Sequence, residues 1–366
     1  MIPFTTVALL GAGLYALFIL FILTGLRRLR PTQHITSVLP FVSVVIAARN
    51  EEKNLSQLLS ALTDQTYPPD RYEVLVSDDR STDNTWAIIE RYTRQHGQVQ
   101  GIRITDLAPD MTPKKRALTQ AIWKAKGEII LSTDGDCVVP NTWIASMVQA
   151  LGTTAGLCVG FSTTTSDGSL LQNYQRVDFL ALMTANAGVI GHGLAWSGSG
   201  QNIAYRTEAF EKINGFIPCA HRLSGDDVYL VQAISRIAPV TFNSDPGSFV
   251  RTNPKESLGE FLQQRIRWAS NSRGLETTKP LFLLFLISAF ISNTAIIPAL
   301  FFPVLRLGTS LILLVKLILE GSVIFFGARQ FRVPLNVRSF AVWALLQPLY
   351  IPVVGVMGFI GKFRWK

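Results

Sequence analysis

Long, mostly apolar runs at both ends of the chain constrain its fold most strongly. A helix needs about 20 apolar residues to cross the hydrocarbon core of a bilayer. Four runs reach that length: Met1–Leu26, Pro280–Leu305, Leu307–Ala328 and Ser339–Gly361. We therefore expect a transmembrane anchor at residues 1–26. We also expect a C-terminal membrane region at residues 280–361, with two or three spanning or interfacial helices.

Two of these runs contain residues that are unusual inside a membrane. Lys316 and Glu320 interrupt one of them, but they stand four positions apart and can form an ion pair on one helical face. Pro348 and Pro352 interrupt the last run. The prolines favour a re-entrant or interfacial segment over a full crossing, and the side of the membrane on which the chain ends stays open.

The net charge of +9 also points to a membrane. Much of the excess positive charge lies beside the apolar runs, as Arg27, Arg28, Arg30, Arg329, Arg332 and Arg338. A signal peptide carries its positive charge before the apolar run, whereas here it follows. The positive-inside rule then predicts an uncleaved anchor with its N-terminus outside and the middle of the chain in the cytoplasm. We expect the membrane to be a bacterial inner membrane. Nucleic-acid binding is disfavoured because the arginines do not alternate with aromatic residues along one face.

The middle of the chain, residues 40–275, has the composition of a globular domain. Its three cysteines show no metal-binding spacing, which suggests a reducing compartment without disulfides. Apolar, β-branched segments alternate with helical patterns, which indicates an α/β domain with a mainly parallel sheet. The expected strands are Phe41–Ala47, Tyr72–Ser77, Gly101–Thr105, Glu128–Ser132, Leu157–Thr165 and Ile203–Tyr205. The main expected helices are Ala117–Ala125, Gln172–Ala187, Val228–Ile237 and Glu260–Asn271.

Two of these strands end in paired carboxylates. Asp78 and Asp79 follow the second strand, and Asp134 and Asp136 flank Gly135 after the fourth. Ligands of open α/β sheets bind at the carboxyl ends of the strands. Carboxylate oxygens suit Mg²⁺ or Mn²⁺, which often take phosphates as further ligands. The alternative is that these aspartates only form turns and cap helices.

Asp226 and Asp227 form a third acidic pair. Adjacent carboxylates repel each other, so one of them can have a raised pKa and act as a general base. Alternatively, the pair caps the following helix and stabilises its dipole.

Two further features contain residues that suit a phosphorylated sugar donor. Gln264, Arg267 and Trp268 project from one side of a helix, where the arginine can bind a phosphate and the tryptophan can stack on a sugar. The alternative is an amphipathic helix on the membrane surface. Lys114 can neutralise a diphosphate, although a solvated charge is the simpler interpretation.

Taken in order, these segments resemble the family 2 inverting glycosyltransferases with the GT-A fold. Each motif is weak alone, but the ordered set is specific. The matching segments are Ala48–Glu52, Asp78-Asp79, Lys114–Leu118, Asp134–Asp136, Gly200–Arg206, Asp226-Asp227 and Gln264–Trp268. Asp226 stands where many relatives have Glu.

The resemblance implies a role for each segment. Arg49, Glu51 and Asp79 would hold the nucleoside, expected to be uridine. Asp134 and Asp136 would bind Mn²⁺ or Mg²⁺ and the diphosphate, with Lys114 and Arg267 stabilising the leaving group. Asp227, beside Asp226, would deprotonate the acceptor. The acceptor-side loop contains Gly200 and Asn202, and Gln264 and Trp268 complete the substrate contacts.

The expected function is transfer of a sugar, with inversion, from a nucleotide-sugar to a lipid-linked or membrane-proximal saccharide. A pattern like Gln264–Trp268 also occurs in processive synthases of cellulose, chitin and hyaluronan. Polysaccharide synthesis, by a homo-oligomer or with envelope-biosynthesis partners, is therefore the first alternative. A non-catalytic subunit that binds sugar nucleotides is the second.

Overall fold

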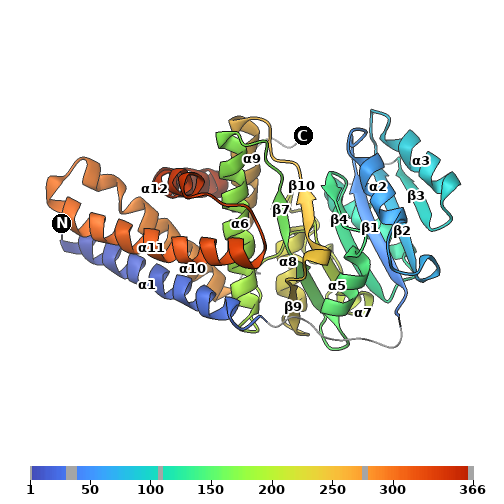
Figure 1. Cartoon of the computed structure of the whole chain (residues 1–366), viewed down its shortest axis with the longest axis horizontal. Coiled ribbons are helices and arrows are strands. Elements are labelled where there is room, and N and C mark those ends of the chain that lie inside the picture. Colours follow the sequence, from blue (N-terminus) through green and yellow to red (C-terminus); the bar gives the residue numbers. More distant parts are fainter. Residues whose placement is uncertain (1, 30–38, 106–109, 274–278, 362–366) are drawn as a thin grey trace. The chain divides into compact units, whose positions relative to one another are not determined.

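The computed structural model describes residues 2–29, 39–105, 110–273 and 279–361 (Figure 1). The chain divides into two compact units, each formed by more than one segment. The sheet unit consists of Leu29–Thr163 and Gly193–Asn253. The helical unit consists of Met1–Arg28, Thr164–His192 and Pro254–Lys366.

A seven-stranded sheet forms the centre of the sheet unit, in the order β3-β2-β1-β4-β8-β6-β9. The first four strands in this order run parallel to one another, as the sequence predicts. Strand β8 runs antiparallel to both of its neighbours, and β6 is parallel to β9. The bounds are β1 Val42–Ala48, β2 Tyr72–Asp79, β3 Val99–Ile104, β4 Ile129–Asp134, β6 Leu157–Gly160, β8 Ile203–Arg206 and β9 Val240–Asn243.

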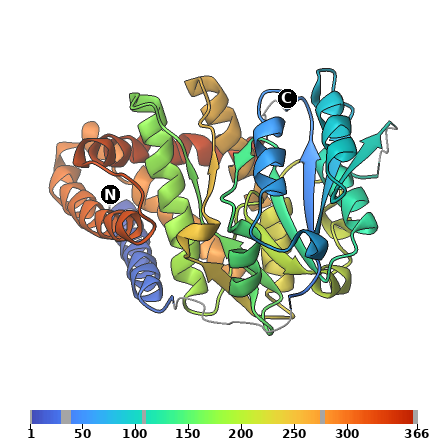
Figure 2. The ribbon, with the colours of Figure 1, turned by 45° about the vertical axis from the view of Figure 1, so that its right-hand side comes forward.

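Helices cover this sheet (Figure 2). Helix α2 (Leu55–Thr63) buries all four of its leucines in the core beneath β1 and β2. Helix α4 (Pro113–Lys124) begins four residues before the expected start, since Pro113 suits the first position of a helix. The other helices are α3 Thr85–Gln95, α5 Trp143–Leu151, α7 Thr207–Lys212 and α8 Asp226–Ile234.

The strand expected at residues 157–165 is in fact two strands in different sheets. After β6, the Phe161 carbonyl accepts from the amide of Val250 at 3.1 Å, which changes the pairing partner of the chain. The next residues form β7 (Ser162–Thr164) in a small second sheet of order β5-β10-β7. Its other strands are β5 Cys137–Val138 and β10 Val250–Thr252.

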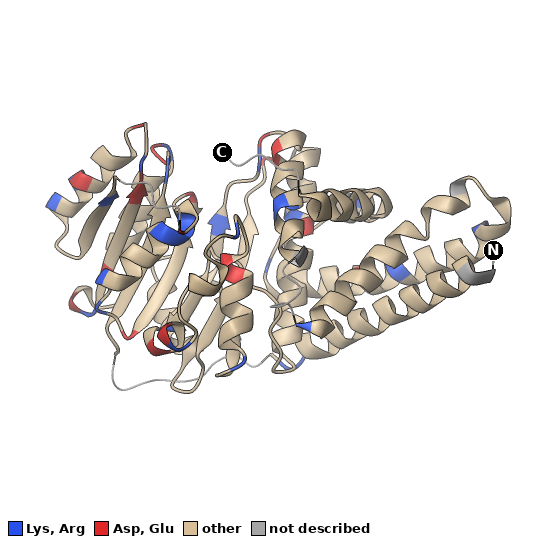
Figure 3. Cartoon of the chain, turned by 180° about the vertical axis from the view of Figure 1, so that it is seen from behind, with Lys and Arg blue, Asp and Glu red and all other residues tan. Residues whose placement is uncertain are grey.

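The helical unit contains all four candidate membrane spans. Charged residues are sparse along these helices (Figure 3). The structure has helices long and apolar enough to cross a membrane at Phe4–Leu26, Pro280–Ala299, Pro303–Gln330 and Val337–Ile360. The helices of this unit are α1 Ile2–Leu26, α6 Leu170–Ile190, α9 Leu258–Ala269, α10 Pro280–Thr294, α11 Arg306–Gln330 and α12 Val337–Ile360.

Polar contacts inside this unit confirm the expected ion pair between Lys316 and Glu320 on one helical face. The Nζ of Lys316 lies 2.7 Å from a carboxylate oxygen of Glu320, and both side chains are buried. The hydroxyl of Tyr15 in α1 donates to Glu320 at 2.6 Å, which joins α1 to α11. Helix α12 stays continuous through Pro348 and Pro352 and is long enough to span. The basic residues Arg30, Lys362, Arg364 and Lys366 lie outside the described residues.

The compact units cut across the expected domain boundaries at residues 40 and 275. Helices α6 and α9 lie within that range but belong to the helical unit. Gly25 of α1 and Gly188 of α6 show why: a Cβ atom built on Gly25 would lie 1.8 Å from the Gly188 carbonyl oxygen. The two helices therefore pack with their backbones in close approach, which makes α6 part of the apolar bundle.

Candidate active site

The register of the central strands brings the predicted acidic residues to one edge of the sheet. Strand β1 lies between β2 and β4, with Ala48 opposite Asp78 and Ala47 opposite Asp134. Since the three strands are parallel, their carboxyl ends meet at the same edge. The expectation that two carboxylate motifs share this edge is confirmed by the register.

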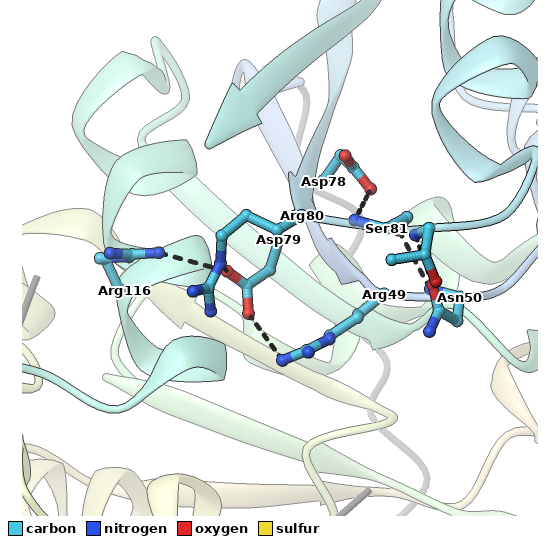
Figure 4. A network of polar contacts seen from close by, with 8 residues as sticks. Arg49, Asn50, Asp78, Asp79, Arg80, Ser81 and Arg116 are labelled. Atoms are coloured by element: carbon cyan, nitrogen blue, oxygen red, sulfur yellow. Dashed lines mark hydrogen bonds and ion pairs between the residues drawn. The ribbon is translucent and has the colours of Figure 1, made fainter. Parts of the chain in front are cut away.

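Arginine side chains surround Asp79 at the end of β2 (Figure 4). Its carboxylate lies 3.2 Å from Arg116, 3.1 Å from Arg80 and 3.8 Å from Arg49. The side chain of Asp79 is 5% exposed, whereas that of Arg49 is 45% exposed. Asp79 therefore anchors three guanidinium groups, and it holds Arg49 where a ligand at the sheet edge can reach it.

The segment after β1 carries Glu51 and is tied to the segment after β2. The Asn50 side-chain oxygen accepts from the amide of Thr82 at 2.8 Å, and Asn50 itself adopts a left-handed φ of 55°. The amide of Glu51 donates to the hydroxyl of Thr85 at 2.8 Å, and its carboxylate accepts from Asn54. A Cβ atom on Gly135 would lie 3.0 Å from the Glu51 side chain, so Glu51 lies against the Asp134–Asp136 turn.

Lys114 joins two of the acidic motifs. It lies in the first turn of α4, and its Nζ is 2.8 Å from Asp134 and 3.6 Å from Asp226. Burial opposes its charge, but the nearby carboxylates of Asp134 and Asp226 outweigh that effect and raise the pKa of Lys114 above its usual value. Lys114 therefore stays protonated and neutralises part of an acidic cluster.

Asp227 lies at the start of α8 with its carboxylate facing the loop that contains Gly200. The amide of Gly200 donates to Oδ2 at 3.1 Å, and the amide of Val228 donates to Oδ1 at 2.8 Å. Burial and the charge of Asp226 raise the pKa of Asp227 to about 6, against the opposing effects of Lys114 and the two amides. This pKa suits a group that must accept a proton near neutral pH.

A metal ion at this edge would need ligands beyond the protein. Among the residues that the structure describes, no group of three or more His, Cys, Asp or Glu side chains could hold a metal ion. Asp134 and Asp136 offer two carboxylates on one turn, and the Asp134 side chain is 29% exposed. Two hard oxygen donors with an open side fit Mg²⁺ or Mn²⁺, because these ions commonly share their coordination with phosphate and water.

Asn202 lies behind the loop rather than on its open side. Its side chain is fully buried, and its amide donates to the carbonyl oxygens of Phe161 and Ser248. Its oxygen accepts from the indole N–H of Trp143 at 2.9 Å. These bonds use the whole amide group, so Asn202 shapes the loop that carries Gly200.

Gln264, Arg267 and Trp268 lie on α9, in the helical unit. The helix begins with a capping box between Ser257 and Glu260. Helix α9 belongs to the helical unit and is therefore described by itself. Contacts inside the sheet unit bring together the other predicted residues, which are Arg49, Glu51, Asp79, Lys114, Asp134, Asp226, Asp227 and Gly200.

Sequence reasoning missed Arg116 as a residue of this site. It is 7% exposed and contacts Asp79. A signal was available, because Lys114, Lys115 and Arg116 place three basic residues in the first turn of α4, and the helix dipole disfavours cations there. Such a cluster indicates acidic partners opposite the start of the helix.

Comparisons with known proteins show which sequences and structures this chain is similar to. Residues 43–214 match the sequence model of Glycosyl transferase family 2. Glycosyltransferase AglE of Haloferax volcanii is 29% identical over 236 residues, which cover 63% of this chain and 73% of that protein. The beta-monoglucosyldiacylglycerol synthase of Nostoc sp. is 32% identical over 136 residues, but these span only 37% of this chain and 28% of the synthase. The probable glycosyltransferase YdaM of Bacillus subtilis is 25% identical over 244 residues, 64% of this chain and 56% of its own length.

A solved structure shares the fold over nearly the whole chain. It is the mannosyltransferase PcManGT from Pyrobaculum calidifontis in complex with GDP-Man and Mn²⁺. The two chains are 18% identical with a TM-score of 0.65, and the match covers 98% of this chain and 99% of that one. At this identity the likeness establishes a shared GT-A-like architecture with a mostly parallel sheet.

Proposed function

We propose that the chain transfers a sugar from a nucleotide-sugar, with inversion, to a lipid-linked or membrane-proximal saccharide, and the match of residues 43–214 to the model of Glycosyl transferase family 2 supports this. The observation that carries the proposal is the cluster of Lys114, Asp134, Asp226 and Asp227, in which one carboxylate has a pKa of about 6. It combines a base, a cation that can neutralise a diphosphate, and carboxylates that suit a divalent metal ion.

In the proposed reaction, the carboxylate of Asp227 takes the proton from an acceptor hydroxyl. The hydroxyl oxygen attacks the anomeric carbon of the donor sugar from the side opposite the diphosphate. The bond between that carbon and the diphosphate oxygen breaks, so the anomeric configuration inverts. Lys114 stabilises the negative charge of the departing nucleoside diphosphate. Mn²⁺ or Mg²⁺ held by Asp134 and Asp136 would supply further positive charge to the diphosphate.

The residues around Asp79 are proposed to hold the nucleoside. The partly exposed Arg49, held by Asp79, and the adjacent Glu51 offer a cation and an acceptor at the edge of the sheet. Gln264, Arg267 and Trp268 on α9 are proposed to complete the donor and acceptor contacts. Uridine is the expected nucleoside, and GDP-sugars are included in the test because the Pyrobaculum mannosyltransferase structure is a complex with GDP-Man.

The acceptor is proposed to lie at a membrane. Four helices of sufficient length and apolar character support integral membrane association. We propose a bacterial inner membrane, with the catalytic unit in the cytoplasm. The name of the Nostoc relative refers to a glycosylated diacylglycerol, which supports a lipid acceptor. Two other outcomes would contradict this proposal. One is polymer synthesis, by an oligomer of this chain or with partners, and the other is donor binding without transfer.

The test is release of nucleoside diphosphate by the full chain in detergent with Mn²⁺ or Mg²⁺. UDP-, GDP- and dTDP-sugars are compared with and without lipid extracts, beside the Asp227→Asn variant. Release from one donor that is lost in the variant supports the proposal, and the product's anomeric configuration tests inversion. Equal release by the variant, or donor binding without release in the presence of lipid extracts, contradicts it.

A further inference from the structure

Arg265, a residue between Gln264 and Arg267, is held in place by an acidic residue on another helix. Its side chain is 6% exposed, and its Nε lies 2.7 Å from Oδ2 of Asp178 in α6. Asp178 also accepts from the indole N–H of Trp343 in α12 at 3.3 Å and lies 3.5 Å from the hydroxyl of Tyr350. The carboxylate therefore ties α6, α9 and α12 together inside the helical unit.

The same guanidinium group contacts two of the side chains proposed to bind substrate. Its Nη1 donates to the side-chain oxygen of Gln264 at 2.9 Å. Its Cζ lies 4.1 Å from the centre of the Trp268 ring, a distance typical of a cation–π contact. One face of Arg265 thus meets an indole, while its edges meet a carboxylate and an amide.

We propose that Arg265 is a positioning residue for glycosyl transfer. It is anchored by Asp178, and it fixes the orientations of Gln264 and Trp268. The inference rests on the proposed function, which assigns those two side chains to substrate contacts. It adds that Gln264 and Trp268 need Arg265, and its partner Asp178 on α6, to keep the orientations that bind substrate.

Arginine suits this role because its guanidinium is planar and carries several N–H groups in fixed directions. One nitrogen reaches Asp178 while another reaches Gln264, and the flat face stays available to Trp268. Lysine keeps the charge and can pair with Asp178, but its single ammonium group cannot reproduce this three-way arrangement. Arg265→Lys therefore separates the charge from the geometry.

The test measures kcat/KM of the full chain in detergent for wild type, Arg265→Lys, Gln264→Ala and the double variant. We expect Arg265→Lys to lower kcat/KM roughly 10- to 100-fold, since a misplacement of about 1 Å can reduce the rate by about 100-fold. In the Gln264→Ala background the same change should have a much smaller effect, because the two residues act together. Arg176→Lys is the matched control, as Arg176 on α6 bonds Asn173 at 2.7 Å and should leave kcat/KM within about twofold.

A spectroscopic readout reports the contact without relying on activity. Arg265→Lys should change the tryptophan emission, and the change should be absent in a Trp268→Phe background and in Arg176→Lys. Asp178→Asn, which keeps Arg265 but removes its anchor, should give the same emission change with a smaller loss of kcat/KM. This second variant tests the inference if Arg265→Lys proves poorly folded.

The outcomes separate this inference from the proposed function. An active wild type whose kcat/KM and Trp268 emission are unchanged by Arg265→Lys overturns the inference alone. So does a loss of kcat/KM that is equally large in the Gln264→Ala background. A wild type that transfers no sugar from any donor overturns both the proposed function and the positioning role.

Discussion

Two pairs of adjacent aspartates in the sheet unit differ in the charge of the side chains that surround them. Asp79, next to Asp78 at the end of β2, is 5% exposed and lies within 4 Å of Arg49, Arg80 and Arg116. Asp227, next to Asp226 at the start of α8, accepts hydrogen bonds from two backbone amides. Lys114 forms ion pairs with both Asp226 and Asp134. Positive charge thus exceeds negative charge around Asp79, whereas three carboxylates gather around Lys114.

This difference separates a carboxylate that is paired with cations from a carboxylate that has a raised pKa. The carboxylate of Asp79, surrounded by guanidinium groups, works as an anchor for them. Burial and the charge of Asp226 raise the pKa of Asp227 to about 6, so that this carboxylate can exchange protons near neutral pH. The two pairs look alike in the sequence, but only the second is suited to be a base.

The largest expected effect tests the second pair. Asp227→Asn should lower kcat by about 1,000-fold, because general base catalysis contributes roughly 100- to 10,000-fold and the amide cannot accept the proton. Steady-state release of nucleoside diphosphate measures this effect. Glu208→Gln is the matched control, since Glu208 is an exposed carboxylate paired with Lys212, and its kcat should stay within about twofold. A variant with kcat near wild type would assign the base elsewhere.

The next effect tests the cation that joins the carboxylates. Lys114→Met should lower kcat/KM by about 100-fold, because the departing diphosphate loses a neutralising charge. It should also move the acidic limb of the pH–rate profile upward, since Lys114 opposes the raised pKa of Asp227. Lys114→Arg keeps the charge and should show a smaller shift of that limb. An unchanged limb in Lys114→Met would mean that Lys114 does not act on the base.

Much of this arrangement is predictable from the sequence, and the part that is not has a physical cause. Apolar runs and their following aspartates locate β1, β2 and β4, because strand burial and turn chemistry are local properties. Pairing of Lys316 with Glu320 is also local, since it depends on helical spacing. By contrast, the contacts of Arg116 with Asp79 and of Arg265 with Asp178 join distant segments, so no local pattern specifies them.

The buried role of Asn202 is a further example. Loop glycines and a polar residue predict a surface that binds substrate, yet Asn202 is buried and bonds three segments of the chain. The break between β6 and β7 was missed for the same reason, because it depends on pairing with β10. Sequence periodicity predicts the secondary structure of a segment, but not which other segment it pairs or packs with.

A smaller effect, on stability, tests the first pair. Asp79→Asn should lower the free energy of unfolding by about 3 kcal/mol, because it leaves the buried guanidinium of Arg116 without its counter-charge. Thermal unfolding in detergent measures the change as a lower midpoint. Asp70→Asn serves as the control, since Asp70 is a largely exposed partner of Arg71 and should leave the midpoint unchanged. A midpoint equal to wild type would mean that Asp79 contributes little as an anchor.

The smallest effect has the opposite sign at the second pair. The pKa of Asp227 is about 6 in the folded protein and near 3.8 in a model peptide, so above pH 6 its ionised form is disfavoured by folding. Asp227→Asn removes that charge and should raise the free energy of unfolding by on the order of 1–2 kcal/mol at pH 8. As the pH falls from 6 towards 3.8, the wild-type carboxyl is protonated in the folded state but still ionised in the unfolded chain, so the advantage of the variant should shrink, and it should disappear only below about pH 3.8. Unfolding at pH 8 and pH 5 in EDTA, which keeps metal ions from the carboxylates, measures this difference. If Asp79→Asn and Asp227→Asn shifted stability in the same direction at pH 8, the two acidic pairs would not differ in the way that their surroundings imply.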